Sequence, residues 1–214
     1  MAPGFSEKGM RAQEPLIMRY VDLLMARLRE RSGETVDIVK WYNWTTFDII
    51  EDLAFGDAYE SLEHSRRHPF IELISGGFKQ SSRLVFVRYM GLPKLSYLAL
   101  FSLLRKGFAM RRHGARALRK RMASPDPHPD LIEPLLLNRD EGDLSFKTLS
   151  TMAAGLLLAG SETTASTLSG VTWLLLSNPE KLEKLTREVR DKFGHERERL
   201  TSCQCRGWSI CLRV

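Results

Sequence analysis

The residues best suited to chemistry are an acid and two hydroxyls that follow one another inside a long apolar stretch. The segment Ala153–Ser166 reads AAGLLLAGSETTAS, in which Glu162 precedes Thr163 and Thr164. Burying a carboxylate among apolar residues costs free energy unless the group is paired or used, so this segment is a candidate proton-handling site. A packing interpretation is also open. In it the hydroxyls bond back to carbonyls one turn earlier, Gly160 permits close helix contact, and Glu162 pairs with a distant base.

The element that carries these residues is a long helix, expected over about 146–177. Ser145 is a good N-cap, and the corner Asn178–Glu180 combines a cap, a first-turn proline and a first-turn acid that begin the next helix. The apolar run Leu149–Leu176 is long enough to cross a bilayer, which makes a single-span membrane protein one hypothesis. Glu162 at its centre favours a buried core helix instead.

Apolar residues recur every three to four positions through most of the remaining chain, as amphipathic helices require. No alternating strand pattern and no repeat is present, so the expected fold class is all-α with about seven helices. The prolines of Ser124–Asp130 predict a surface loop. We expect residues 1–193 to form a partial helical domain and 194–214 to be an aberrant, disordered tail. The other expected helices cover Gln13–Arg29, Ile38 to a stop at Gly56 with Asp37 as cap, Pro69–Val87, Leu95–Met122, Leu131–Leu137 and Pro179–Phe193.

One segment makes the chain basic. The chain has 32 Lys and Arg against 26 Asp and Glu, a net charge of +6, and the stretch Arg105–Arg121 is rich in Arg and Lys and contains no acid. Such a run is usually the solvated face of a helix, and its core sequence RRHGARALRKR lacks interleaved aromatics, so no nucleic-acid partner is expected. The first residues lack the apolar stretch of a signal peptide, and no membrane anchor is expected in this chain.

The segment Ala159–Thr164, AGSETT, resembles the oxygen-activation motif (A/G)-G-x-(D/E)-T-(T/S) of cytochromes P-450, the haem-thiolate monooxygenases, at all of its positions. The flanking segments HPDLIEPLLLNRDEGDLSFKTLS and LSNPEKLEKLTREVRDKF resemble the family's adjacent helices. The segment Trp41–Glu63 is similar to fungal secondary-metabolite members. The resemblance runs from Phe5 to Leu200, and it implies the central helical portion of the P-450 fold, truncated at both ends.

The resemblance assigns roles to four residues of this motif. Glu162 and Thr163 would be catalytic, the acid relaying protons and the hydroxyl hydrogen-bonding to dioxygen, while Ala159 and Gly160 would line the haem and dioxygen groove. The family's cofactor is haem. Its partners are an NADPH-dependent cytochrome reductase and a small apolar substrate, and full-length members reside on the cytosolic face of the endoplasmic reticulum membrane.

The iron ligand of the family is not found where its motif predicts. That ligand is a cysteine in F-x-x-G-x-R-x-C-x-G, and none of Cys203, Cys205 and Cys211 has this context. We therefore expect no axial cysteine, no metal ligand and no stable haem binding in this chain. The family also has an E-x-x-R pair on a later helix; Glu63–Arg66 and Glu196–Arg199 have the spacing but are attributed to chance.

Two functions remain open from the sequence. The first is a P-450 monooxygenase that uses O2 and NADPH-derived electrons to oxidise a small apolar metabolite in secondary metabolism, with this chain inactive by itself. The alternative is a non-catalytic helical remnant or partner-binding protein, which would expose large apolar faces. The location of the chain itself is left open, with the cytoplasm as the default.

Overall fold

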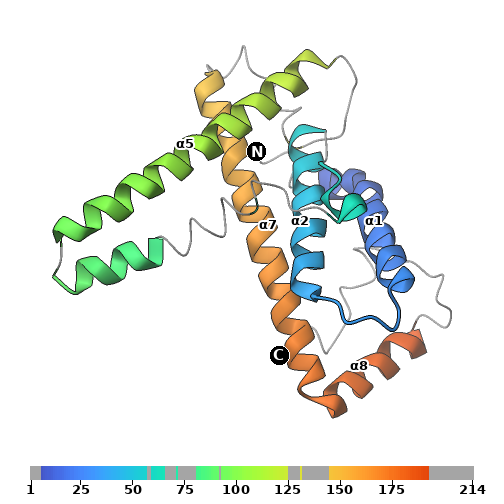
Figure 1. The fold of residues 1–214 in the computed structure, drawn as a ribbon. Coiled ribbons are helices and arrows are strands. Elements are labelled where there is room, and N and C mark those ends of the chain that lie inside the picture. The colour runs from blue at the N-terminus through green and yellow to red at the C-terminus, as the bar shows by residue number, and fades with distance from the viewer. Residues whose placement is uncertain are drawn as a thin grey trace.

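The computed structural model describes residues 6–56, 59–65, 71, 81–91, 93–124, 131 and 145–192 (Figure 1). These residues form helices and no strand, which confirms the expected all-α fold. Residues 81–89 are helical, and they precede α5 in the chain. The other helices are α1 (Glu7–Glu30), α2 (Ile38–Phe55), the short α3 (Ser61–His64), α5 (Pro93–Ala123), α7 (Phe146–Leu176) and α8 (Pro179–Lys192).

Side-chain caps mark the starts of α2 and α7. Asp37 accepts a hydrogen bond from the Lys40 N–H at the start of α2, and Ser145 accepts one from the Thr148 N–H, 3.2 Å away, at the start of α7. Helix α2 stops at Gly56, whose left-handed φ of 66° suits glycine. The capping residues and helix ends predicted for α2 and α7 are therefore confirmed to within two residues.

Helix α1 begins earlier than its hydrophobic pattern predicted. The pattern starts at Gln13, but the helix starts at Glu7, where Ser6 accepts a hydrogen bond from the Gly9 N–H at 3.1 Å. Pro15 lies inside this helix, within its third turn. The first two turns are mostly polar, so no apolar periodicity marked them, and the N-cap serine was the available signal.

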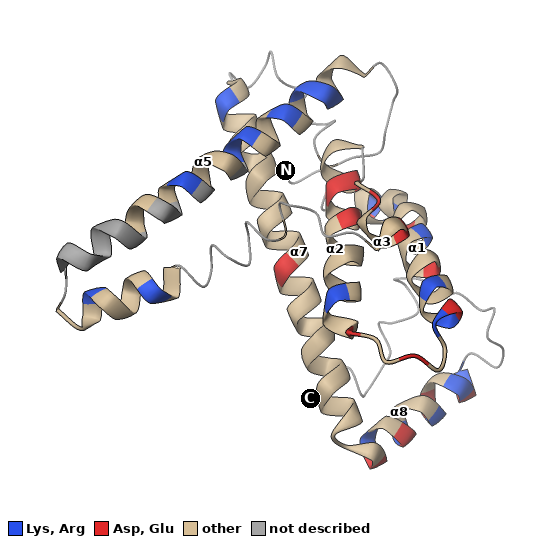
Figure 2. Cartoon of the chain, in the orientation of Figure 1, with Lys and Arg blue, Asp and Glu red and all other residues tan. Residues whose placement is uncertain are grey.

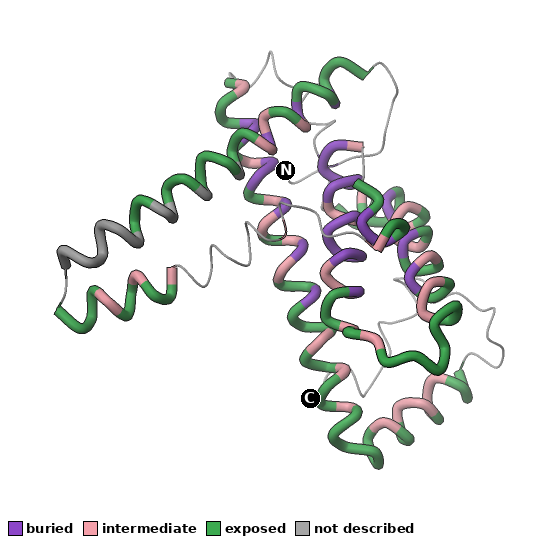
Figure 3. Tube along the Cα trace, viewed as in Figure 1, coloured by how far each residue is buried: buried purple, intermediate pink, exposed green. Residues whose placement is uncertain are grey.

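Helix α2 lies at the centre of the described structure, buried along most of its length (Figure 3). One side of it contributes Phe47, Ala54 and Phe55 to a core completed by α5 and α7. Its other side places Trp41 and Trp44 against α1, and the two indoles meet edge to face with centroids 5.2 Å apart. Helix α7 packs against α2 and α5 along its N-terminal half, so α2 is what positions the candidate site.

The C-terminal half of α7 and all of α8 are much less covered. Trp173 and Leu176 are each 67% exposed, and α8 has no buried residue. Within the described ranges, no helix is both long and apolar enough to cross a bilayer, and α7 is among those ranges. The run Leu149–Leu176 lies within α7, where nine hydroxyl residues and Glu162 dilute its apolar residues.

Several sequence predictions fall outside the described residues. The start of the predicted helix Pro69–Val87, most of the loop Ser124–Asp130 and the tail 194–214 are among them. So is the helix predicted over Leu131–Leu137, apart from its first residue. Leu131 itself is buried in a bend, and its N–H donates to the Leu53 carbonyl at the end of α2 at 2.7 Å.

Candidate functional site

Helix α7 divides the predicted site residues between two faces. Ala159 and Thr163 lie on an exposed face, whereas Gly160 lies on the side that packs against α2, and Glu162 is half-buried between them. Gly155, one turn before Ala159, is also exposed, and a Cβ placed there would meet no atom within 4 Å. The four predicted residues are thus brought within two turns of one helix, although they do not share one face.

Gly160 is the point of closest approach between α7 and α2. A Cβ added to Gly160 would lie 2.7 Å from Cγ1 and 2.8 Å from Cδ1 of Ile50. One residue further on, the Thr46 hydroxyl on α2 donates to the Ser161 carbonyl on α7 at 3.1 Å. Contacts this short need a residue without a side chain, so Gly160 has the role in helix packing that the packing interpretation gave it.

The Thr163 hydroxyl already donates its proton within α7, so in this conformation it can only accept a hydrogen bond from another group. Its Oγ1 donates to the Ala159 carbonyl one turn earlier at 2.5 Å. Since a hydroxyl has one proton and two lone pairs, the oxygen remains able to accept a hydrogen bond from outside the helix. Donating outward requires the hydroxyl proton to turn away from Ala159, by rotation about the Cβ–Oγ1 bond or about χ1, which breaks the hydrogen bond to the Ala159 carbonyl.

Glu162 is the single acid of α7, in a helix otherwise almost free of charge (Figure 2). Partial burial raises the pKa of its carboxyl, because desolvation disfavours the ionised form. In the part of the chain that the structure describes, no base pairs with this carboxyl. A carboxyl with a raised pKa and no fixed partner is a candidate for giving and taking protons.

The exposed face of α7 is compatible with a flat cofactor lying against it. Ala159 and Thr163 are exposed on this face, and a Cβ added to Gly155 would meet no atom within 4 Å. Among the described residues, no group of three or more His, Cys, Asp and Glu side chains could hold a metal ion. The three cysteines lie at positions 203, 205 and 211, outside the described residues.

Sequence reasoning missed a set of buried acids on α2. The Asp52 carboxylate accepts from the Tyr20 hydroxyl at 2.7 Å and from the Arg19 guanidinium at 2.8 Å, which ties α1 to α2. Burial, followed by this hydrogen bond to Asp52, raises the pKa of the Tyr20 phenol well above its usual value. The signal was available, since the helix carries three acids among apolar residues, but a sequence does not show which acids are buried.

Asp48 and Glu51 are the other two buried acids of α2. The two carboxylate oxygens of Asp48 accept from the Ser61 and Leu62 N–H groups at 3.1 and 2.8 Å, and burial raises its pKa to about 6. Glu51 lies 3.2 Å from His113 of α5 and also accepts from the Tyr59 N–H. These acids fix α1, α3 and α5 around the helix that holds the candidate site.

Comparison with known proteins identifies the class of this assembly. The family model for Cytochrome P450 matches residues 1–205. The chain is 42% identical over 200 residues to cytochrome P450 monooxygenase tpeC of Talaromyces stipitatus, covering 92% of this chain and 39% of that protein. It is 40% identical over 204 residues to averantin hydroxylase of Dothistroma septosporum, covering 92% and 38% of the two chains. For trichothecene C-4 hydroxylase of Trichoderma arundinaceum the identity is 42% over 205 residues, with 92% and 41% covered.

Comparison with solved structures gives the same fold as the family match. The structure matches the heme domain of cytochrome P450DA with a TM-score of 0.72 at 20% identity, over 92% of this chain and 43% of that one. The chain therefore belongs to the cytochrome P450 family, as its AGSETT motif predicted, and its relatives include fungal monooxygenases of secondary metabolism. It spans about two fifths of the length of these relatives.

Proposed function

We propose that this chain forms the oxygen-activating middle of a haem-dependent monooxygenase that oxidises a small apolar metabolite. The observation that carries the proposal is the arrangement of the AGSETT motif on α7. Its residues Ala159 and Thr163 are exposed on one face of the helix, while Gly160 packs against α2 on the other. The names of two relatives, averantin hydroxylase and trichothecene C-4 hydroxylase, support hydroxylation as the reaction class.

The motif residues have separate tasks in this proposal. Haem, when bound, supplies the redox centre for dioxygen, with electrons from an NADPH-dependent reductase. Ala159 has a small side chain, which leaves room beside α7 for the cofactor and dioxygen. The Thr163 hydroxyl accepts or, after rotation, donates a hydrogen bond at that surface, and the Glu162 carboxyl exchanges protons with it.

We also propose that the 214-residue chain does not carry out this reaction by itself. None of its three cysteines lies in the family's ligand motif, and iron without an axial thiolate lacks the electron donation on which O–O cleavage depends. By family analogy, we propose the cytosolic face of the endoplasmic reticulum membrane as the location of the working enzyme. A non-catalytic partner-binding protein is the second candidate, favoured by the exposure of Trp173 and Leu176.

Sequencing of the full-length transcript separates these two candidates. The monooxygenase proposal expects a mature message in which E-x-x-R and then F-x-x-G-x-R-x-C-x-G are encoded downstream of the codon for Leu200. A mature message that ends at the codon for Val214, with neither motif in any frame, would contradict it and leave the partner-binding protein as the better account.

A further inference from the structure

Helix α2 contacts α7 through three residues that lie four positions apart, and therefore along one side of α2. Two of these contacts are polar, although the core between the helices is apolar. The Tyr42 hydroxyl lies 2.9 Å from the Thr172 hydroxyl near the end of α7. The Thr46 hydroxyl lies 3.1 Å from the Ser161 carbonyl oxygen, inside the AGSETT motif. The third residue, Ile50, makes the close apolar approach to α7.

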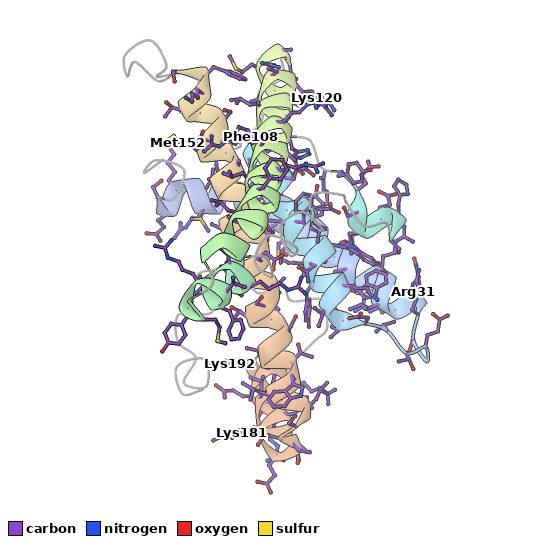
Figure 4. The ribbon with its side chains drawn as sticks, turned by 60° about the vertical axis from the view of Figure 1, so that its left-hand side comes forward. Arg31, Phe108, Lys120, Met152, Lys181 and Lys192 are labelled. Atoms are coloured by element: carbon purple, nitrogen blue, oxygen red, sulfur yellow. The ribbon has the colours of Figure 1, made fainter. Side chains whose placement is uncertain are left out.

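The group that Thr46 contacts on α7 is the backbone carbonyl of the peptide unit that joins Ser161 to Glu162. Along α7 this peptide comes after Met152, which is labelled in Figure 4. In a regular helix its carbonyl accepts from the N–H of Ala165, and one lone pair is left over. Ser161 and Ala165 are both buried, so the Thr46 hydroxyl stands where water would bind on an exposed helix. Because a peptide unit is planar, a bond to its oxygen also fixes the plane from which Glu162 begins.

The neighbouring residue Thr45 is equally buried but does not contact the motif in this way. Its hydroxyl donates to the Trp41 carbonyl, one turn earlier on α2, at 2.8 Å, and among the described residues it makes no hydrogen bond to α7. The Thr46 hydroxyl also has a carbonyl of its own helix within reach, that of Tyr42 at 2.9 Å. Thr46 therefore shares one proton between α2 and the Ser161 carbonyl, whereas the proton of Thr45 stays within α2.

We propose that Thr46 is a positioning residue of the AGSETT motif, which holds the backbone at Glu162 so that this carboxyl stays half-buried at the edge of the exposed face. Apolar packing at Gly160 brings the two helices together but has no preferred direction, whereas a hydrogen bond does. Thr46 acts through the Ser161 carbonyl and not on the reacting atoms. The task of the Glu162 carboxyl rests on the proposed function, but the hydrogen bond that positions it does not.

Thr46→Val tests this role, because valine keeps the shape of threonine and removes the hydroxyl. Without the hydrogen bond the motif is free to turn, and the Glu162 carboxyl reaches water more often. Its pKa should then fall from its raised value toward the ordinary one, by a few tenths of a pH unit. The measurement is a carbon NMR titration of the purified 214-residue chain with labelled glutamate carboxyls, in which Glu162→Gln identifies the signal.

Thr45→Val is the matched control, since it makes the same substitution at the adjacent buried position and removes only a hydrogen bond within α2. It should leave the Glu162 titration unchanged even where it lowers the stability of the chain. Thr46→Ser keeps the hydroxyl and should titrate like the unmodified chain. An unchanged Glu162 midpoint in Thr46→Val would overturn the proposal, and so would an equal shift in Thr45→Val or a shift of the same size in Thr46→Ser.

Circular dichroism shows whether each variant keeps its helices. Should Thr46→Val fail to fold, Thr46→Ala against Thr46→Ser makes the same comparison with smaller side chains, and equal Glu162 midpoints in that pair would also overturn the proposal. The titration needs neither haem nor any sequence beyond this chain. A transcript that ends at Val214 would therefore contradict the proposed function alone, and an unchanged Glu162 midpoint would contradict the role of Thr46 alone.

Discussion

Replacement of Gly160 by valine should lower the free energy of unfolding of this chain by about 3 kcal/mol, because overpacking a tight helix contact forces its neighbours apart. A Cβ alone would come within 2.7 Å of Ile50 Cγ1, and the branched valine side chain adds two more methyl groups at the same place. The displacement also strains the hydrogen bond from Thr46 to the Ser161 carbonyl. Urea unfolding followed by far-ultraviolet circular dichroism measures the change.

Gly155→Val is the matched control, since it is the same substitution on the same helix where nothing lies within 4 Å of the added Cβ. We expect it to be neutral or slightly stabilising, because glycine is a poor helix former. Ile50→Ala should recover part of the loss when it is combined with Gly160→Val. If both valine variants unfold at the same urea concentration, Gly160 is not a packing residue and the assignment of faces on α7 is wrong.

Replacement of Asp48 by alanine should cost about 2 to 4 kcal/mol, because it leaves two buried N–H groups, those of Ser61 and Leu62, without an acceptor. Asp48→Asn keeps one acceptor oxygen and should cost less. Asp191→Ala, which removes an exposed acid of α8, should change stability by less than about 0.5 kcal/mol. Equal losses for the alanine variants of Asp48 and Asp191 would contradict the buried hydrogen bonds.

The Asp48 variant also predicts a pH dependence. Burial raises the pKa of this carboxyl from an ordinary 3.8 to about 6, so the folded chain holds the proton more tightly than the unfolded chain does. Its contribution to stability is therefore fully present below pH 3.8 and is lost as the pH rises through about 6. The gap in unfolding free energy between the unmodified chain and Asp48→Ala should be wider at pH 5 than at pH 7.5.

The ends of α2 and α7 and the start of α8 could be predicted from the sequence because they depend on groups close along the chain. Ser145 caps α7 through an N–H three residues later, and Asn178 and Pro179 begin α8 directly after α7 ends. Helix α2 stops at Gly56 because only a residue without a Cβ adopts a left-handed φ without strain. The motif on α7 was also a local signal, and the family match confirms the resemblance drawn from it.

Which side of α7 packs against α2 and which side is exposed could not be predicted, because this depends on where α2 lies. A glycine in mid-helix serves equally well to open a cofactor groove or to admit a neighbouring helix, and only the position of Ile50 shows that Gly160 admits one. The buried acids of α2 were missed for the same reason. Asp48 finds its donors 13 and 14 residues away and Asp52 finds Tyr20 32 residues away, beyond the reach of any local pattern.

The proposed function is that this chain supplies the oxygen-activating helix of a monooxygenase, with none of its three cysteines serving as the ligand of the iron. The most direct test is the absorption spectrum of the reduced carbon monoxide complex, recorded on the purified 214-residue chain after expression with haem supplied. The account predicts no thiolate-type shift of the Soret band, because Cys203, Cys205 and Cys211 do not lie in the ligand motif. A stable thiolate-type Soret band would show that one of these cysteines binds the iron and would contradict the account.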